Sequence, residues 1–413
     1  MNSMEIRQAF AGLLTLSMFI MLGNMIKKDH FDYPAEEVEI QTTEVSQHDL
    51  ATVSHISQKS KQNDKALKPC WNPPTLKEVE QSKGFIIFSL TNGPEYHIAQ
   101  VADAVVVAKY LGATLVLPDI KNSKSGNSMN LGDIYDVENV LNKLNGLVKV
   151  TKTLPPHVST RNTPIVRVPN KVSQDYIMKK LKPIYQAKGI IKIESYFPSK
   201  NTISRNNNSL ESLLCQTMFG GTLELKKEIQ EEAESIVQKL ETWSQESNGP
   251  FVAVDLRIEG LKNECNGKDG KGRKQCYQGH EIGEFLKRIG FGQETVIYVT
   301  QTKWSPDLNS LRYMFPKTYT KENIMSSTKK EKFINSESIE FEKAIDFYIC
   351  SESDVFVPSI LGPFYENVAG MRIVSGKNEI IVPSEVVSPS ASASEHMSPY
   401  VTKKNHLAYK CFC

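Results

Sequence analysis

The stretch from Phe85 to Ile120 constrains this chain more than any other, because it has the pattern of one complete strand–helix–strand unit. Phe85–Leu90 (FIIFSL) is a short apolar run that suits a strand buried on both faces. Asn92-Gly93-Pro94 supplies the residues of a tight turn. Apolar residues then recur at helical spacing over Ala99–Leu111, and Thr114–Leu117 begins the next buried strand. The stretch therefore predicts a βαβ crossover and an α/β fold with a parallel sheet.

The turn after the first strand is a candidate ligand site. In parallel sheets, ligands bind beyond the carboxyl ends of the strands. Asn92 and Gly93 lie in this turn, and His97 follows shortly after it. We therefore predict that these three residues contact a ligand, with His97 as a candidate acid, base or sugar contact. The simpler alternative for His97 is a surface residue near a helix start.

A second α/β series follows the first. Glu224–Glu246 has the pattern of a long, charged amphipathic helix that closes the first series, and Pro250–Leu256 begins the second with a buried strand. Further elements are expected at helices Asn139–Val150 and Ser173–Leu181 and at strands Ile190–Ile193, Thr295–Thr300, Asp354–Pro358 and Glu379–Val382. Two series of similar size predict two Rossmann-like domains that face a cleft, at residues 70–247 and 248–413.

The amino-terminal part has a different character. Gln8–Ile26 contains no charged residue and is about as long as a membrane-spanning helix. No convincing cleavage site follows it, so we expect an uncleaved signal anchor behind a short tail of residues 1–7, rather than a cleaved signal peptide. Residues 27–69 are polar and lack a sustained period, which is typical of a flexible stem. The anchor, the cysteines and the glycosylation sequon at Asn207 favour the oxidising secretory lumen.

The chain has seven cysteines and no Cys-x-x-Cys pair, a pattern that favours disulfides over a structural zinc site. Cys265 and Cys276 bracket a loop, and a bridge between them would stabilise the fold by roughly 3 kcal/mol in the loop-entropy model. The alternative is two free surface thiols. Cys411 and Cys413 are too close to pair with each other comfortably, so we expect them to bridge to other cysteines. Cys350, in an apolar helix end, is the expected unpaired thiol.

Candidate chemistry begins with Asp255-Leu256-Arg257, at the end of a buried strand. The planar guanidinium of Arg257 suits bidentate contacts to a diphosphate, and Asp255 would either orient that arginine or act as a base. The alternative is a turn cap at Asp255 and a solvated Arg257. Ser351, Ser353 and Asp354 form a second candidate, because small hydroxyls and backbone amides can hold phosphates or ribose. Simple capping is the competing interpretation.

Several motifs are absent from the sequence. It contains no Asp-x-Asp that would hold a divalent metal against a sugar diphosphate, no P-loop and no Gly-x-Ser-x-Gly elbow. The net charge is only +2, and no basic block is interleaved with aromatic residues, so nucleic acid is not an expected partner. We therefore predict a site without metal or other cofactor, in which arginine and backbone amides stabilise a leaving diphosphate.

Three segments, NGPEYHIAQVADAVVVAKYLGATLVLPDI, FVAVDLRIEG and DFYICSESDVFVPS, occur in an order and spacing that resembles the plant O-fucosyltransferase-like family of glycosyltransferases. The resemblance is strongest to its mannan-synthesis-related members, covers almost the whole chain, and includes IESYFPS and the terminal KKNHLAYKCFC. It implies a GT-B fold, a single-pass type II Golgi membrane protein with a lumenal catalytic domain, and a role in making mannan or glucomannan of the plant cell wall.

The sequence departs from the wider family at two places. Typical members have His-Leu-Arg where this chain has Asp255-Leu256-Arg257, so Arg257 inherits the implied diphosphate contact while Asp255 lacks the chemistry of an imidazole. The first turn of the wider family is more glycine-rich and ends in arginine, unlike residues 92–98 here. GDP-mannose and GDP-fucose are therefore both candidate sugar donors.

The leading hypothesis is an inverting, metal-independent glycosyltransferase that uses a GDP-sugar. Arg257, Leu256, the turn at Asn92 and the 351–354 segment would bind the sugar donor, and Asp255 would be the base. A competing hypothesis is a catalytically silent Golgi partner of cellulose-synthase-like mannan synthases, which the loss of the family histidine motivates. A third alternative is a lectin-like glycan binder.

Overall fold

The computed structural model describes residues 68–71, 84–121, 128–197, 208–257, 277–334, 339–384 and 392–413, all of which belong to one compact unit within Leu50–Cys413. Among these residues, no helix is long and apolar enough to cross a membrane. The predicted anchor at 8–26, nearly all of the stem, the sequon at Asn207 and the pair Cys265 and Cys276 lie outside the described residues.

The first sheet is built around β1, and it contains seven strands within the described part of the chain. These strands are β1 (Phe85–Leu90), β2 (Thr114–Val116), β3 (Asp119–Lys121), β4 (Ser128–Met129), β5 (Val150–Thr151), β6 (Ile165–Pro169) and β7 (Ile190–Tyr196). Strand β1 pairs in parallel with β2 and β3 and with β7, while β3 and β4 pair antiparallel. The predicted parallel arrangement of β1 and β2 is confirmed.

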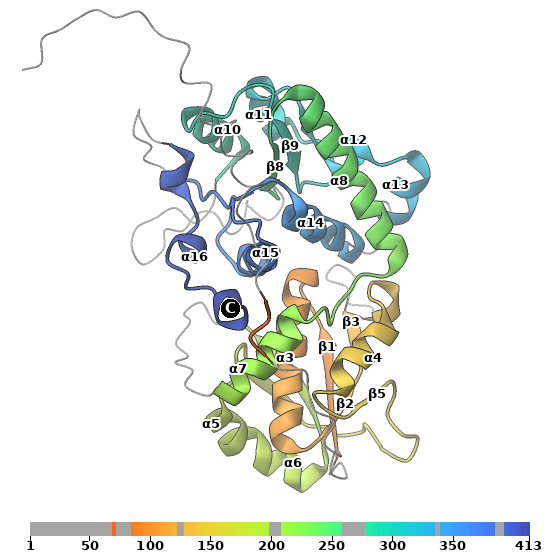
Figure 1. The fold of residues 1–413 in the computed structure, drawn as a ribbon. Coiled ribbons are helices and arrows are strands. Elements are labelled where there is room, and N and C mark those ends of the chain that lie inside the picture. The colour runs from red at the N-terminus through yellow and green to blue at the C-terminus, as the bar shows by residue number, and fades with distance from the viewer. Residues whose placement is uncertain are drawn as a thin grey trace, which may run out of the picture. The chain divides into compact units, whose positions relative to one another are not determined.

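The helices of this part connect the strands. They are η1 (Leu131–Asp133), α3 (Pro94–Leu111), α4 (Val137–Asn145), α5 (Gln174–Tyr176), the π-helical η2 (Ile177–Leu181), α6 (Lys182–Lys188) and α7 (Asn208–Phe219). Helix α3 begins at Pro94, five residues before the predicted start at Ala99. Proline is well tolerated in the first turn of a helix, because the N–H that it lacks has no partner there. The amino end of α3 therefore lies directly beside the turn that follows β1 (Figure 1).

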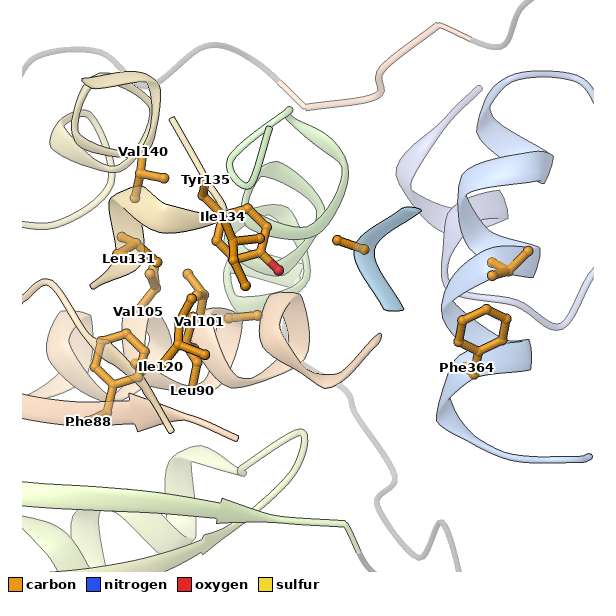
Figure 2. Close-up of a cluster of buried hydrophobic side chains, with 14 of the residues drawn as sticks. Phe88, Leu90, Val101, Val105, Ile120, Leu131, Ile134, Tyr135, Val140 and Phe364 are labelled. Atoms are coloured by element: carbon orange, nitrogen blue, oxygen red, sulfur yellow. The ribbon is translucent and has the colours of Figure 1, made fainter. Parts of the chain in front are cut away.

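The core beneath that turn is apolar and closely packed. In β1, Ile86 and Leu90 are fully buried, and Phe88 is nearly so. Figure 2 shows Val101 and Val105 projecting from α3 toward the apolar residues of the 131–134 segment. This packing fixes the position of α3 and, with it, of the residues at its amino end.

The second sheet has the strand order β10-β9-β8-β11, and all of its pairs are parallel. Its strands are β8 (Phe251–Asp255), β9 (Val296–Val299), β10 (Thr318–Tyr319) and β11 (Val355–Pro358). In chain order this is third, second, first, fourth, which is the order of half a Rossmann fold. Strands β9 and β10 are added on one side of β8 and β11 on the other, so the order of the strands changes direction between β8 and β11. Ligand sites in such sheets lie beyond the carboxyl ends of the two strands at this switch point.

Helices cover both faces of this sheet. They and the short carboxyl-terminal helices are α8 (Lys227–Ser247), α10 (Gly279–Arg288), η3 (Pro306–Leu308), α11 (Asn309–Met314), α12 (Lys321–Ile324), α13 (Ser327–Phe333), α14 (Glu340–Glu352), α15 (Pro363–Val374), η4 (Ala393–His396), α16 (Pro399–Thr402) and α17 (Ala408–Cys411). In β8, Phe251 and Ala253 belong to one apolar cluster and Val252 and Val254 to another, and all four are fully buried. The predicted strand with two buried faces is confirmed.

Two predicted elements differ from the structure, and one strand was missed. The helix expected over Asn139–Val150 ends at Asn145, where Gly146 follows, and Val150 instead begins β5. Strand β6 was not predicted, because it has an exposed Ile165 and alternates too weakly for a buried run. The strand expected over Glu379–Val382 forms only isolated bridges.

Two disulfides join distant parts of the described chain, Cys70 to Cys413 and Cys215 to Cys411. They surround a small apolar cluster to which Trp71 and Phe412 contribute, with ring centres 5.0 Å apart. Cys350 is unpaired and fully buried. The expectations for Cys411, Cys413 and Cys350 are confirmed.

We expect the Cys215–Cys411 bridge to matter more for stability than the buried thiol. Removing it with the double change Cys215→Ala and Cys411→Ala should lower the free energy of unfolding by about 2–5 kcal/mol, because the unfolded chain gains freedom. Cys350→Ala, the matched control, should cost about 1 kcal/mol for one lost buried group. Chemical unfolding of the three proteins measures both effects, and equal losses would contradict this prediction.

Candidate functional site

The carboxyl ends of β1 and β8 meet through a direct side-chain contact. Glu95 lies in the first turn of α3, just beyond β1, and Arg257 lies just beyond β8. The Nη1 atom of Arg257 is 3.4 Å from Oε1 of Glu95. Asn367 of α15 donates a hydrogen bond from Nδ2 to the main-chain oxygen of Glu95. Because ligand sites in parallel sheets lie at the carboxyl ends of strands, this meeting point is the candidate site.

Arg257 is held firmly but is still accessible. Its Nε atom donates a hydrogen bond of 2.9 Å to Oδ1 of Asp255, and its guanidinium lies 4.4 Å from the centre of the Phe364 ring. About a quarter of its side chain (27%) is exposed. Burial lowers the pKa of Arg257, but the carboxylates of Asp255 and Glu95 outweigh this effect and raise the pKa overall. The site therefore presents a permanent, oriented cation.

Asp255 has the geometry of an orienting residue. It is almost fully buried, and Oδ1 accepts hydrogen bonds from Arg257 and, at 3.2 Å, from Oγ1 of Thr300. Its main-chain oxygen accepts from the N–H of Ser359, which follows β11. Of the two roles predicted for Asp255, the geometry fits orientation of Arg257 directly. The role of catalytic base stays a prediction.

Glu95 is a second buried carboxylate at the site, and the sequence analysis did not single it out. It is 3% exposed, and its Oε2 atom has no hydrogen-bond partner in the described part of the chain. Burial raises the pKa of Glu95, while the positive charges of Arg257 and Lys343 oppose that shift. A carboxylate with an unsatisfied oxygen and a raised pKa is suited to accept a proton. Its signal in the sequence was its place directly after Gly93-Pro94.

The turn between β1 and α3 is tightly constrained. Asn92 and Gly93 both have a positive φ, of 69° and 109°. A Cβ atom on Gly93 would lie 2.5 Å from Oε2 of Glu95 and 2.8 Å from Cδ of Lys343. Lys343 of α14 also donates a hydrogen bond of 3.1 Å to the main-chain oxygen of Asn92. Both predicted residues therefore lie at the candidate site, and the positive φ at position 93 favours glycine there.

His97 lies in the interior instead. Its side chain is fully buried, and Nδ1 is 2.8 Å from the hydroxyl of Tyr135. Burial, followed by the charge of Lys343, lowers the pKa of His97 to about 3. It is one helical turn before Val101 on the buried stripe of α3, so it packs as part of the core. Neither the predicted ligand contact nor the alternative surface position describes it.

Ser351, Ser353 and Asp354 lie at the opposite edge of the second sheet. They precede β11, whose first residue Val355 pairs with Val252 and whose last residue Pro358 pairs with Asp255. Oδ2 of Asp354 accepts a hydrogen bond from the N–H of Phe251. The structure therefore does not bring this segment to Arg257, because residues before a parallel strand lie at its amino end.

Buried Arg372 gives the polar segment 351–354 a structural role. Its guanidinium donates hydrogen bonds of 2.7 Å to the main-chain oxygen of Ser353 and 2.9 Å to that of Asp354. Ser353 itself is fully buried. The segment thus has a structural role, in line with the capping interpretation.

The segment after β11 takes the expected place beside Arg257. Gly362 and Pro363 begin α15, and the cap residue Gly362 provides no side-chain hydrogen bond to the helix. Phe364, in the first turn, stacks on the guanidinium of Arg257. Gly362-Pro363 repeats the Gly93-Pro94 start of α3, and this repeated dipeptide after a buried strand was the signal that the sequence analysis missed. A helix amino end with uncapped N–H groups favours anions.

Within the described ranges, no group of three or more His, Cys, Asp or Glu side chains is arranged to hold a metal ion.

Comparison with known proteins places the chain in a family. Residues 96–375 match the family model described as GDP-fucose protein O-fucosyltransferase. The chain belongs to this family. Protein MANNAN SYNTHESIS-RELATED 1 of Arabidopsis thaliana is 47% identical over 420 residues, and Protein MANNAN SYNTHESIS-RELATED 2 of the same plant is 46% identical over 422. Each alignment covers 99% of both chains. The predicted resemblance is confirmed, and the protein is a glycosyltransferase of this family.

Similar solved structures include POFUT1 in complex with GDP and the NodZ alpha-1,6-fucosyltransferase soaked with GDP-fucose. Both are 15% identical to this chain. The TM-scores are 0.44 and 0.39, with coverage of 73% and 70% of this chain and 99% and 92% of theirs.

We expect His97 to make the protein less stable in acid. Its folded pKa of about 3 lies below the ordinary value of 6.5, so between these pH values the unfolded chain binds the extra proton and stability falls as the pH is lowered. The slope from this group is at most about 1.4 kcal/mol per pH unit. In His97→Gln, the slope of the unfolding free energy against pH, measured between pH 6 and pH 4, should be smaller by up to about 1.4 kcal/mol per pH unit.

The exposed His157→Gln is the matched control, because its imidazole is in water in both states. If the dependence of unfolding free energy on pH is unchanged in His97→Gln, the lowered pKa of His97 would be contradicted.

Proposed function

We propose that this protein is a Golgi glycosyltransferase that transfers a sugar from a GDP-sugar during mannan or glucomannan synthesis in the plant cell wall. The observation that carries the proposal is the accessible, doubly anchored Arg257 where the carboxyl ends of β1 and β8 meet. Family membership and the names of the two mannan-synthesis-related relatives support it. The parallel sheets, with these two edges in contact, support a GT-B-like arrangement of two Rossmann-like domains, 70–247 and 248–413.

The sugar donor would bind through its diphosphate. The fork of Arg257 offers paired N–H groups to phosphate oxygens, and the amino end of α15 beside it adds backbone N–H groups. Leu256 links Asp255 to Arg257, and its N–H donates to Oγ1 of Thr300, which fixes the backbone at this point. Asn92 and Gly93, in the turn after β1, would contact the sugar donor from the edge of the first sheet. GDP-mannose and GDP-fucose are the first sugar donors to test.

In the reaction, a hydroxyl oxygen of the acceptor attacks the anomeric carbon of the sugar. The bond between that carbon and the diphosphate breaks, and GDP leaves with the electron pair, stabilised by Arg257. The oxygen attacks from the face opposite the diphosphate, which inverts the anomeric carbon, and the hydroxyl proton passes to a carboxylate. Glu95 fits this base role by its unsatisfied Oε2, and Asp255 then keeps Arg257 in place. We propose that no metal takes part.

We also propose a type II membrane topology. Residues 1–7 would be cytosolic, residues 8–26 the anchor and residues 27–69 the stem, and the folded unit would be lumenal. The two disulfides support an oxidising compartment. N-glycosylation at Asn207 and a bridge between Cys265 and Cys276 belong to the same proposal.

Arg257→Ala should strongly weaken binding of the sugar donor. We expect GDP and GDP-mannose affinities, measured by calorimetry on the full-length protein with and without Mg²⁺, to fall at least about 30-fold, the scale of a lost charged hydrogen-bond pair of about 2 kcal/mol. Arg257→Lys should retain only part of the nucleotide affinity, because lysine keeps the positive charge but lacks the paired N–H groups of the guanidinium.

The surface residue Arg288, paired with Glu284, supplies the control Arg288→Ala. Full nucleotide affinity in Arg257→Ala would remove Arg257 from the site. If the unchanged protein binds no GDP-sugar yet co-purifies with a mannan synthase, the role is that of a silent partner.

Substitutions of Glu95 and of Asp255 should affect different kinetic parameters. Glu95→Gln is expected to lower kcat by about 100-fold or more and to weaken GDP binding much less, because the proton acceptor is lost while Asp255 still anchors Arg257. Asp255→Asn should instead weaken nucleotide binding, because the guanidinium loses its charged anchor. Steady-state kinetics combined with nucleotide titration distinguish the two. The reverse pattern would make Asp255 the base.

A further inference from the structure

The start of α3, which carries Glu95, is held in place by three contacts from the later part of the chain. Arg257 lies 3.4 Å from Oε1 of Glu95, and Asn367 of α15 donates a hydrogen bond to the main-chain oxygen of the same residue. Lys343 of α14 donates a hydrogen bond of 3.1 Å from Nζ to the main-chain oxygen of Asn92. The reaction proposed above uses Arg257 but leaves Lys343 without a role.

The ammonium group of Lys343 lies close to the carboxylate of Glu95. A Cβ atom on Gly93 would be 2.5 Å from Oε2 of Glu95 and 2.9 Å from Nζ of Lys343, so both atoms border the same small space beside Gly93. Arg257 contacts the other carboxylate oxygen, Oε1. The carboxylate of Glu95 therefore has one cation near each of its two oxygens.

Lys343 differs from a lysine whose ammonium group is fully used by the fold. Buried Lys321 donates to three oxygen atoms, namely the main-chain oxygen of Thr300 and both carboxylate oxygens of Asp346. Within the part of the chain that the structure describes, Lys343 makes one hydrogen bond and no direct ion pair. An ammonium group has three N–H donors, so two of them and the positive charge of Lys343 are available to the site.

The charges that face Glu95 come from two parts of the chain. Arg257 follows β8, while Lys343 and Glu340 lie on α14, three residues apart and hence on the same face of that helix. Burial raises the pKa of Glu95, Arg257 and then Lys343 lower it, and Glu340 adds a smaller upward effect. Without Lys343, Glu95 would hold a proton more readily, and a protonated carboxyl group cannot act as a base.

Two further ionisable groups near Glu95 stay neutral near neutral pH. Burial, followed by the charge of Lys343, lowers the pKa of His97 to about 3. Burial raises the pKa of Tyr135 well above its ordinary value, and the charges of Glu340 and Glu95 add to this effect. His97 and Tyr135 therefore bring no charge to the surroundings of Glu95.

We propose that Lys343 is a positioning residue for the reaction. Its ammonium group fixes the turn before Glu95 and supplies the second counter-charge to the carboxylate that accepts the proton. The proposal rests on the function proposed above, in which Glu95 is the base. It assigns the preparation of that base to α14, a helix of the proposed donor-binding half of the chain.

The test follows the release of GDP from GDP-mannose and from GDP-fucose by the full-length protein, with water as the acceptor. In this reaction a water oxygen attacks the anomeric carbon, Glu95 takes one proton of that water, and GDP leaves with the electron pair of the broken bond. The dependence of kcat/KM on pH reports the pKa of the base in the free enzyme. Lys343→Gln removes the charge but keeps an N–H donor for Asn92, whereas Lys343→Arg keeps the charge.

In Lys343→Gln, we expect the acidic limb of the kcat/KM profile to move to higher pH by about one unit, the lower end of the effect of a charge about 4–6 Å away. The rate at high pH and the GDP affinity should stay within about threefold, because the base is then deprotonated and Arg257 is unchanged. Lys343→Arg should leave the limb within about 0.3 unit of its original position. Lys377→Gln, the matched control, should not move the limb, because Lys377 donates to the main-chain oxygen of Glu352 at the other end of α14.

An NMR titration of the Glu95 carboxyl carbon, identified as the signal that Glu95→Gln lacks, should show the same shift without turnover. A titration that does not move in Lys343→Gln overturns the proposal. So does a rate that falls by the same factor at every pH, which would make Lys343 a structural brace. A loss of GDP affinity as large as in Arg257→Ala would make it a phosphate contact instead. If the unchanged protein binds no GDP-sugar, the proposed function itself fails, and the role of Lys343 fails with it.

Discussion

The candidate site depends on the buried contact between Asp255 and Arg257, which fixes a cation at the edge of a sheet. Beneath it, Thr300 connects Asp255 to a second buried pair. Lys321, fully buried, donates from Nζ to the main-chain oxygen of Thr300 at 2.9 Å and to both carboxylate oxygens of Asp346 at 2.8 Å. Burying charges is costly unless each one is paired and hydrogen-bonded. These contacts therefore fix the position of Asp255 and Arg257 more than they raise the stability of the fold. Arg257 is accordingly oriented before any ligand arrives, and the reorganisation cost at the moment of reaction is small.

The candidate site and the surface around Lys171 differ in charge. Around Arg257 there is a permanent cation and a helix amino end, which together attract an anion. Around Lys171 the cation is paired with Glu366, and most of the other side chains that line the hollow beside it are apolar.

The sequence predicted the parts of the fold whose pattern is local. The strand that leads into Asp255 was found because a strand buried on both faces leaves a simple signal. The apolar run of β1 also predicted a strand, but its expected burial on both faces was wrong, because only alternate residues of β1 are buried. Strand β6 left no such signal, because an edge strand is half exposed. The site was predicted in part. Arg257 follows directly from its place after a buried strand, whereas Ser351 to Asp354 were chosen for their chemistry although they precede their strand. Glu95 became visible only through tertiary contacts, since nothing local distinguishes it from a helix-start acid.

The two disulfides have a mechanical consequence. Cys70 stands at the start of the folded unit and is bonded to Cys413, while the neighbouring Cys411 is bonded to Cys215 in α7. If the chain before Cys70 is pulled, the load passes into these covalent bonds and the packed helix before it reaches the hydrogen bonds of β1. Strand β1 carries the turn that positions Gly93 and Glu95. A protein tethered through its amino-terminal side would therefore keep the geometry of its site while the tether is under tension.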